Sequence, residues 1–148
     1  MLTHHELTIR VRYQETDGMA RVHHSNFLTW FELGRTEMLR AAGFSYSNVE
    51  EQGFYLVIAE ASCKYFLPAR FDDVLLLRTT IKRARGATIE HEYELFRDDQ
   101  LLATGRTLIA CVDRAGNVRR LPEWLRTREG EAPAEPQPRI GSDDTAVS

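Results

Sequence analysis

A carboxylate and two adjacent histidines, Asp17, His23 and His24, lie close together near the start of the chain. A carboxylate can act as a nucleophile or general base, and imidazole can exchange a proton near neutral pH. However, Thr-Asp-Gly is also typical of a turn, in which the aspartate accepts hydrogen bonds from nearby backbone amides. The residues alone leave a catalytic and a purely local role for Asp17 open.

The same cluster does not predict a metal site. Adjacent histidines in an extended loop point in different directions, and no further ligand is spaced to join Asp17, His23 and His24. The chain also has no Gly-x-Ser-x-Gly elbow, glycine-rich phosphate loop or Cys-x-x-Cys pair.

The elements that must position Asp17 are a strand before it and a helix after it. Apolar residues alternate with polar ones from Glu6 to Gln14, which predicts a half-buried strand. From Asn26 the apolar residues recur every three or four positions until Gly43, which predicts a helix with Ser25 or Asn26 as its N-cap. Unpaired amides at the start of that helix would favour negative charge beside Asp17.

The rest of the chain to residue 121 is predicted to form four more strands, at 54–67, 74–83, 88–96 and 101–112. One long helix and five strands with clean alternation indicate an α+β fold, a five-stranded antiparallel sheet wrapped around one long helix. Such a sheet has open edges, and pairing them between copies would hide them. A homodimer or homotetramer is therefore expected.

Composition separates a folded body, 1–121, from an acidic, proline-rich segment, 122–148, which is expected to be disordered. The body balances sixteen acidic against sixteen basic residues, so no nucleic-acid partner is predicted. No apolar run is long enough to cross a bilayer, and neither a membrane partner nor a leader segment is predicted. We expect a cytoplasmic protein in which Cys63 and Cys111 are free thiols.

Three blocks, at 11–17, 22–27 and 31–37 (VRYQETD, VHHSNF and FELGRTE), resemble the 4-hydroxybenzoyl-CoA thioesterase family. The resemblance extends over roughly residues 6 to 113 and implies the hotdog fold and cleavage of an acyl-CoA thioester. It implies that Asp17 is the nucleophile or general base and that the amide of His24 polarises the thioester carbonyl. Because some related thioesterases place their carboxylate on the helix, the resemblance also makes Glu32, and more weakly Glu37, a reserve candidate for catalysis. No cofactor is implied, because coenzyme A is part of the substrate. Ala20 stands where the family commonly has glycine, and Arg21 is a large charged residue in the same loop.

Binding residues are less sharply predicted. Asn26 is either a helix cap or a contact in the pocket. Lys82, Arg83 and Arg85 form the best local supply of cations for the phosphates of coenzyme A, although they also suit a solvated turn. Lys64 and Arg70 are weaker alternatives for that role.

Three alternative functions remain. They are a non-catalytic module that binds acyl-CoA, a thioesterase acting on acyl-carrier protein, and a hotdog hydratase or dehydratase. The last has no convincing match in this sequence, because such enzymes rely on a different arrangement of His and acidic residues.

Overall fold

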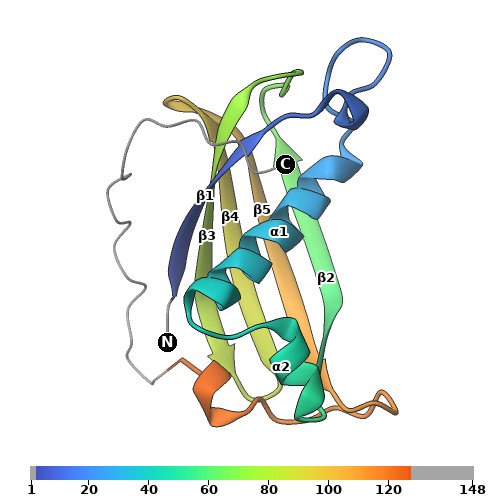
Figure 1. Ribbon diagram of the computed structural model, residues 1–148, viewed down its shortest axis with the longest axis vertical. Coiled ribbons are helices and arrows are strands. Elements are labelled where there is room, and N and C mark those ends of the chain that lie inside the picture. Colours follow the sequence, from blue (N-terminus) through green and yellow to red (C-terminus); the bar gives the residue numbers. More distant parts are fainter. Residues whose placement is uncertain (1–2, 128–148) are drawn as a thin grey trace.

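A curved antiparallel sheet wraps around one long helix in the computed structural model, which describes residues 3–127 (Figure 1). The strand order is β1-β3-β4-β5-β2, and every neighbouring pair is antiparallel. The predicted α+β hotdog fold is confirmed. The bounds are β1 His4–Arg10, α1 Ser25–Ala41, α2 Tyr46–Glu51, β2 Tyr55–Tyr65, β3 Val74–Arg85, β4 Thr88–Arg97 and β5 Gln100–Val112.

Helix α1 packs closely on the sheet because two glycines lie at the contact. A Cβ on Gly34 of α1 would lie 2.5 Å from Thr79 Oγ1 on β3, and one on Gly105 of β5 would meet the ring of Phe31. Phe31 is fully buried and stacks on Tyr93 of β4, with 4.4 Å between ring centroids. The apolar face predicted for this helix is thus the face that contacts the sheet.

The first strand is shorter than predicted, because β1 ends at Arg10 and Tyr13–Glu15 form a 3-10 helix. The Glu15 carboxylate accepts a hydrogen bond from the Arg12 backbone amide at 2.7 Å, which curls the chain at this point. Val11 is buried as the alternation requires, whereas Tyr13 is 77% exposed. The period-two pattern therefore ran past the true end of the strand.

A second helix, α2, was not predicted. Ser45 caps it by accepting a hydrogen bond from the Asn48 amide at 3.2 Å, and Val49 is its buried residue. At six residues it is too short to show a helical period in the sequence.

The folded domain also extends past the predicted boundary at residue 121. Glu123–Leu125 form a 3-10 helix in which Leu125 is buried, and Trp124 stacks on Phe44 with 4.2 Å between ring centroids. The apolar pair Trp124 and Leu125 and the backbone hydrogen bond from the Thr127 amide to the Ala84 carbonyl at 2.8 Å attach this stretch to the body. The remainder of the predicted acidic segment, 128–148, lies outside the described residues.

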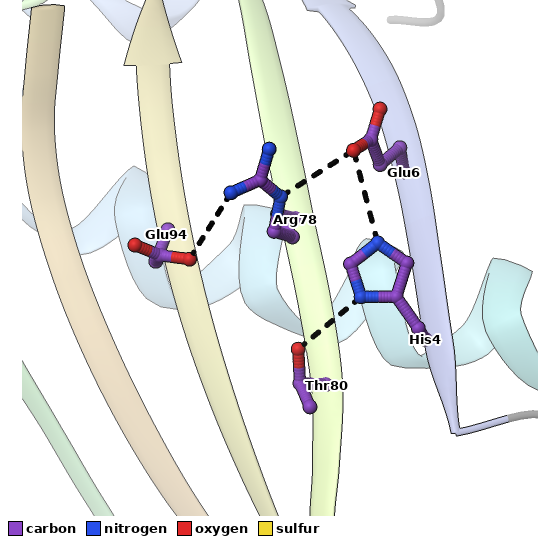
Figure 2. A network of polar contacts seen from close by, with 5 residues as sticks. All are labelled: His4, Glu6, Arg78, Thr80 and Glu94. Atoms are coloured by element: carbon purple, nitrogen blue, oxygen red, sulfur yellow. Dashed lines mark hydrogen bonds and ion pairs between the residues drawn. The ribbon is translucent and has the colours of Figure 1, made fainter. Parts of the chain in front are cut away.

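The sheet face opposite α1 carries a ladder of charged side chains (Figure 2). Arg78 on β3 lies between Glu6 of β1 and Glu94 of β4, at 3.4 and 3.5 Å. His4 contacts Glu6 and Thr80 at the end of the same row. These cross-strand pairs of opposite charge stabilise the register modestly.

Cys63 and Cys111 are both free, as predicted. Between residues 3 and 127, no helix combines the length and apolar character needed to span a membrane.

Candidate active site

Asp17 lies in a tight loop between the 3-10 helix and α1. Thr16 and Val22 face each other across an isolated β-bridge, and the Asp17 amide donates to the Arg21 carbonyl at 2.7 Å. The side chain of Asp17 is exposed, and its Oδ1 accepts a hydrogen bond from the Met19 amide at 2.8 Å. Its Oδ2 has no hydrogen-bond partner within residues 3–127. Asp17 is thus a turn residue that also presents a free carboxylate oxygen to solvent.

Ala20 adopts a positive φ of 61° in this loop. An L-residue with a Cβ pays a steric cost there, whereas glycine does not. The departure noted in the sequence, alanine where the resembled family commonly has glycine, therefore falls on a position whose backbone favours glycine. The loop still closes, because the Ala20 amide donates to the Asp17 carbonyl at 3.1 Å.

Glu15 anchors the loop to the start of α1. It is 4% exposed, and its Oε2 accepts a hydrogen bond from the Trp30 indole at 2.8 Å. Its carbonyl oxygen accepts from the His23 amide at 2.9 Å and from Asn26 Nδ2 at 3.0 Å. Asn26 is therefore not the helix cap; it ties the helix to the loop. The sequence predicted no role for Glu15, although its carboxylate lies beside the predicted end of a strand.

His24, rather than the predicted Ser25 or Asn26, occupies the N-cap position of α1, and its own side chain makes no capping hydrogen bond; the Ser25 amide donates instead to His23 Nδ1 at 3.2 Å. The His24 backbone amide has no hydrogen-bond partner among the described residues, and its carbonyl accepts from the hydroxyl of Tyr65 on β2 at 3.1 Å. The His24 ring is exposed and packs on His23, with 4.3 Å between ring centroids. The free His24 amide is the group suited to accept developing negative charge.

The predicted phosphate cluster lies at the other end of the molecule. β3 begins at Val74, opposite Arg10 and close to the loop, and Lys82 follows eight residues later, roughly 26 Å along the strand. Lys82 pairs with Glu92 at 3.2 Å on the outer face, and Arg83 lies opposite Glu90. Within one chain, Asp17, His24 and Asn26 belong to the loop and helix start that the Glu15 carbonyl joins, whereas Lys82, Arg83 and Arg85 lie far along β3.

A cavity of about 370 Å³ lies between α1 and the 3-10 helix. Trp30, Leu33 and Ile9 supply apolar walls, while Glu15 and Glu32 add carboxylates. The reserve candidate Glu32 therefore faces this space, whereas Asp17 is not part of its lining. The other reserve candidate, Glu37, forms an ion pair with Arg40.

Buried polar side chains also lie between α1 and β4, further along the helix. Arg35 is 8% exposed and donates to the hydroxyl of Tyr93 at 3.4 Å, and a small apolar cavity separates it from His91. Burial, with the nearby charge of Arg35 adding to it, lowers the pKa of His91 to about 3. His91 is thus uncharged near neutral pH. No cluster of three metal-ligating side chains occurs in the part of the chain that the structure describes.

Comparisons with known proteins identify the family of this chain. Residues 11–128 match the model of the thioesterase-like superfamily. The acyl-CoA thioesterase YbgC of Haemophilus influenzae is 36% identical over 106 residues, which cover 71% of this chain and 78% of that protein.

Solved structures give the same result. A probable thioesterase from Bartonella henselae superposes with a TM-score of 0.76 at 31% identity, over 80% of this chain and 99% of that one. The 1,4-dihydroxy-2-naphthoyl-CoA thioesterase Slr0204 from Synechocystis has a TM-score of 0.76 at 27% identity, over 81% and 90% of the two chains. By sequence and by fold, the chain belongs to the thioesterase-like superfamily of hotdog-fold thioester hydrolases.

Proposed function

We propose that this protein hydrolyses an acyl-CoA thioester, with Asp17 as the catalytic carboxylate and the His24 amide as part of the oxyanion site. The observation that carries the proposal is the pairing of these two groups on one anchored loop. Asp17 has a free Oδ2, and the His24 amide at the start of α1 has no partner within the described residues. The names of relatives such as the YbgC thioesterase support the acyl-CoA substrate class.

The reaction follows from the two groups. The thioester carbonyl oxygen accepts a hydrogen bond from the His24 amide, and the positive end of the α1 dipole favours the oxyanion that forms. Asp17 either removes a proton from an attacking water or attacks the carbonyl carbon itself to give an anhydride, which water then opens. In both routes the C–S bond breaks and the thiolate of coenzyme A leaves. A thiolate leaves readily, so neither a metal nor a serine triad is needed.

Glu15 and Asn26 act as positioning residues. Through Trp30 and His23 they fix the distance between the loop and the helix start. The cavity beside α1 is the space proposed for the acyl group in one chain, because Ile9, Trp30 and Leu33 give it an apolar wall, although its other lining side chains are polar or charged. Nothing in these walls selects between aromatic and aliphatic acyl groups.

We also propose that the active protein is a homodimer joined through β2. This strand is eleven residues long and, among residues 3–127, is an edge of the sheet that pairs with β5 alone. Val57 and Ile58 on it are 44% and 48% exposed, and an open apolar edge is a ready surface for strand pairing with a second copy. Binding of the coenzyme A phosphates by Lys82, Arg83 and Arg85 stays a prediction. A tetramer of such dimers and a cytoplasmic location stay predictions.

The test of the proposed function is thiol release from benzoyl-, hydroxynaphthoyl- and fatty acyl-CoA. Asp17→Asn keeps an oxygen for the Met19 amide, so the turn is preserved while the carboxylate is lost. We expect kcat to fall at least about 100-fold for Asp17→Asn. Glu32→Gln is the matched carboxylate control from the neighbouring cavity, and we expect it to retain most of the activity.

Three outcomes would contradict the proposal. Equal rates for wild type and Asp17→Asn would remove Asp17 from the mechanism, and a larger loss for Glu32→Gln would transfer the role to Glu32. Binding of acyl-CoA by wild type without thiol release would favour the non-catalytic module. Turnover of acyl-carrier protein but not of acyl-CoA would change the carrier and keep the mechanism.

A further inference from the structure

Two arginines face each other beside the Asp17 loop. Arg21 and Arg70 are partners in an isolated antiparallel β-bridge. The next residue pair, Val22 and Ala69, is joined by a backbone hydrogen bond of 2.9 Å and is buried. Because side chains alternate along extended backbone, Arg21 and Arg70 project together to the exposed side.

Neither guanidinium has an ion pair in the part of the chain that the structure describes. The other arginines at this end of the molecule are each matched by a carboxylate. Arg10 pairs with Asp72 at 3.2 Å, Arg12 with Glu15 at 3.6 Å and Arg97 with Asp73 at 2.9 Å. Asp73 also accepts a hydrogen bond from the Arg70 backbone amide, so the carboxylates near Arg70 are engaged elsewhere.

Like charges directly opposite each other across a strand pair are destabilising unless an anion lies between them. Guanidinium groups match phosphate oxygens in geometry and charge. We propose that Arg21 and Arg70 bind the phosphate at the end of the pantetheine arm of the thioester substrate, an assignment that rests on the proposed function.

The position of the pair relative to Asp17 suits this role. Asp17 is hydrogen-bonded to Arg21, and Arg21 is bridged to Arg70, so the three residues follow one another across adjacent chain segments. Two strand spacings place the Arg70 backbone on the order of 10 Å from that of Asp17, and the arginine side chains reach further. The phosphate would thus be held on the same side of the loop as the reacting carboxylate but separated from it, as the pantetheine arm requires.

The same phosphate occurs in two substrates. In coenzyme A it is the first phosphate of the pyrophosphate, and in acyl-carrier protein it joins the arm to a serine. A site for this phosphate serves either carrier, whereas a site for the nucleotide end serves coenzyme A alone. The experiment therefore compares thioesters of one acyl group on pantetheine, phosphopantetheine, coenzyme A and acyl-carrier protein.

We expect Arg21→Ala/Arg70→Ala to lower kcat/KM about 10- to 100-fold for the three substrates that carry the phosphate, mainly through KM. Acyl-pantetheine, which lacks it, should be cleaved equally by wild type and variant. Arg21→Lys/Arg70→Lys should recover part of the loss. Arg114→Ala/Arg120→Ala is the control, because both residues are exposed and the variant changes the net charge equally.

An equal loss with acyl-pantetheine would overturn the proposal, since it would mean that the variant disturbs the loop. So would unchanged kinetics with every substrate, or a loss seen with acyl-CoA but not with acyl-phosphopantetheine. If wild type cleaves none of the four thioesters, the proposed function fails. The phosphate site at Arg21 and Arg70 is then tested by calorimetric binding of coenzyme A. Binding weakened by the double substitution and not by the control would then support it, and equal binding would overturn it.

Discussion

Glu15 and Asp17 are carboxylates two residues apart in opposite environments. Glu15 is buried, and its carboxylate accepts a hydrogen bond from the Trp30 indole. Asp17 is exposed, and its carboxylate accepts one from the Met19 amide of its own turn. A buried carboxylate with fixed partners is suited to position a loop, and an exposed one with a free oxygen is suited to react. The two roles of anchor and reactive group are thus divided between neighbours in the sequence.

This division was only partly predictable. Asp17 could be found because Thr-Asp-Gly precedes a helix and belongs to a block with a family resemblance. Glu15 could not, because its importance depends on Trp30, fifteen residues later, turning back onto it. The link between Tyr65 and His24 spans 41 residues and was equally hidden, since no local pattern reports a contact between a distant strand and a helix start.

Ala20 allows a direct test at the residue scale. Replacing it with glycine removes the steric cost at φ 61°. Glycine also adds freedom to the unfolded chain, so we expect a net gain of about 0.5 kcal/mol in the free energy of unfolding, measured with urea. Ala41→Gly, at the end of α1, is the matched control and should lose about 0.5–1 kcal/mol. A loss at Ala20 as large as that at Ala41 would show that the positive φ carries no strain.

At the scale of elements, the contact between α1 and β3 determines where the helix lies. A Cβ at Gly34 would also come within 2.7 Å of Leu77 Cδ2, so the helix backbone can lie against the Thr79 and Leu77 side chains only because residue 34 has no side chain. Periods of two and of three to four residues predicted the order of the strands and the long helix along the chain. They also predicted which face of the helix is buried. The ends of elements were not, because the Glu15 and Ser45 side-chain hydrogen bonds that shape them override periodicity.

Gly34→Ala should therefore destabilise the fold. Overpacking at a tight backbone contact typically costs about 1–3 kcal/mol, and we expect a loss in that range in urea unfolding. Gly18→Ala is the control, because a Cβ there meets nothing within 4 Å, and it should change stability by less than about 0.5 kcal/mol. Equal effects of the two substitutions would mean that α1 shifts freely on the sheet.

At the scale of the whole molecule, the two edges of the sheet differ. β1 is seven residues long and ends where the chain turns into the 3-10 helix, whereas β2 is eleven residues long with exposed apolar side chains. The sequence predicted that edges would be hidden by assembly but not which edge, because strand order cannot be read from alternation. Only the topology identifies β2 as the apolar edge.

Lysines on this edge should prevent the proposed pairing. We expect Val57→Lys/Ile58→Lys to sediment as a monomer under conditions in which wild type sediments as a dimer. Thr8→Lys, on the opposite edge, should stay dimeric. A dimeric Val57→Lys/Ile58→Lys protein, or a monomeric wild type, would contradict assembly through β2.

The loop that carries Asp17 is attached to the domain mainly through its main chain. The Val22 and His23 amides bind carbonyls of Ala69 and Glu15, while residues 18–21 expose all of their side chains. Mutation can therefore change residues 18–21, which carry three side chains, without repacking a core, and the carboxylate stays in place while its surroundings change. Substitutions in this loop can therefore change substrate preference during evolution with little loss of stability. Sequence differences between relatives should be concentrated in this loop.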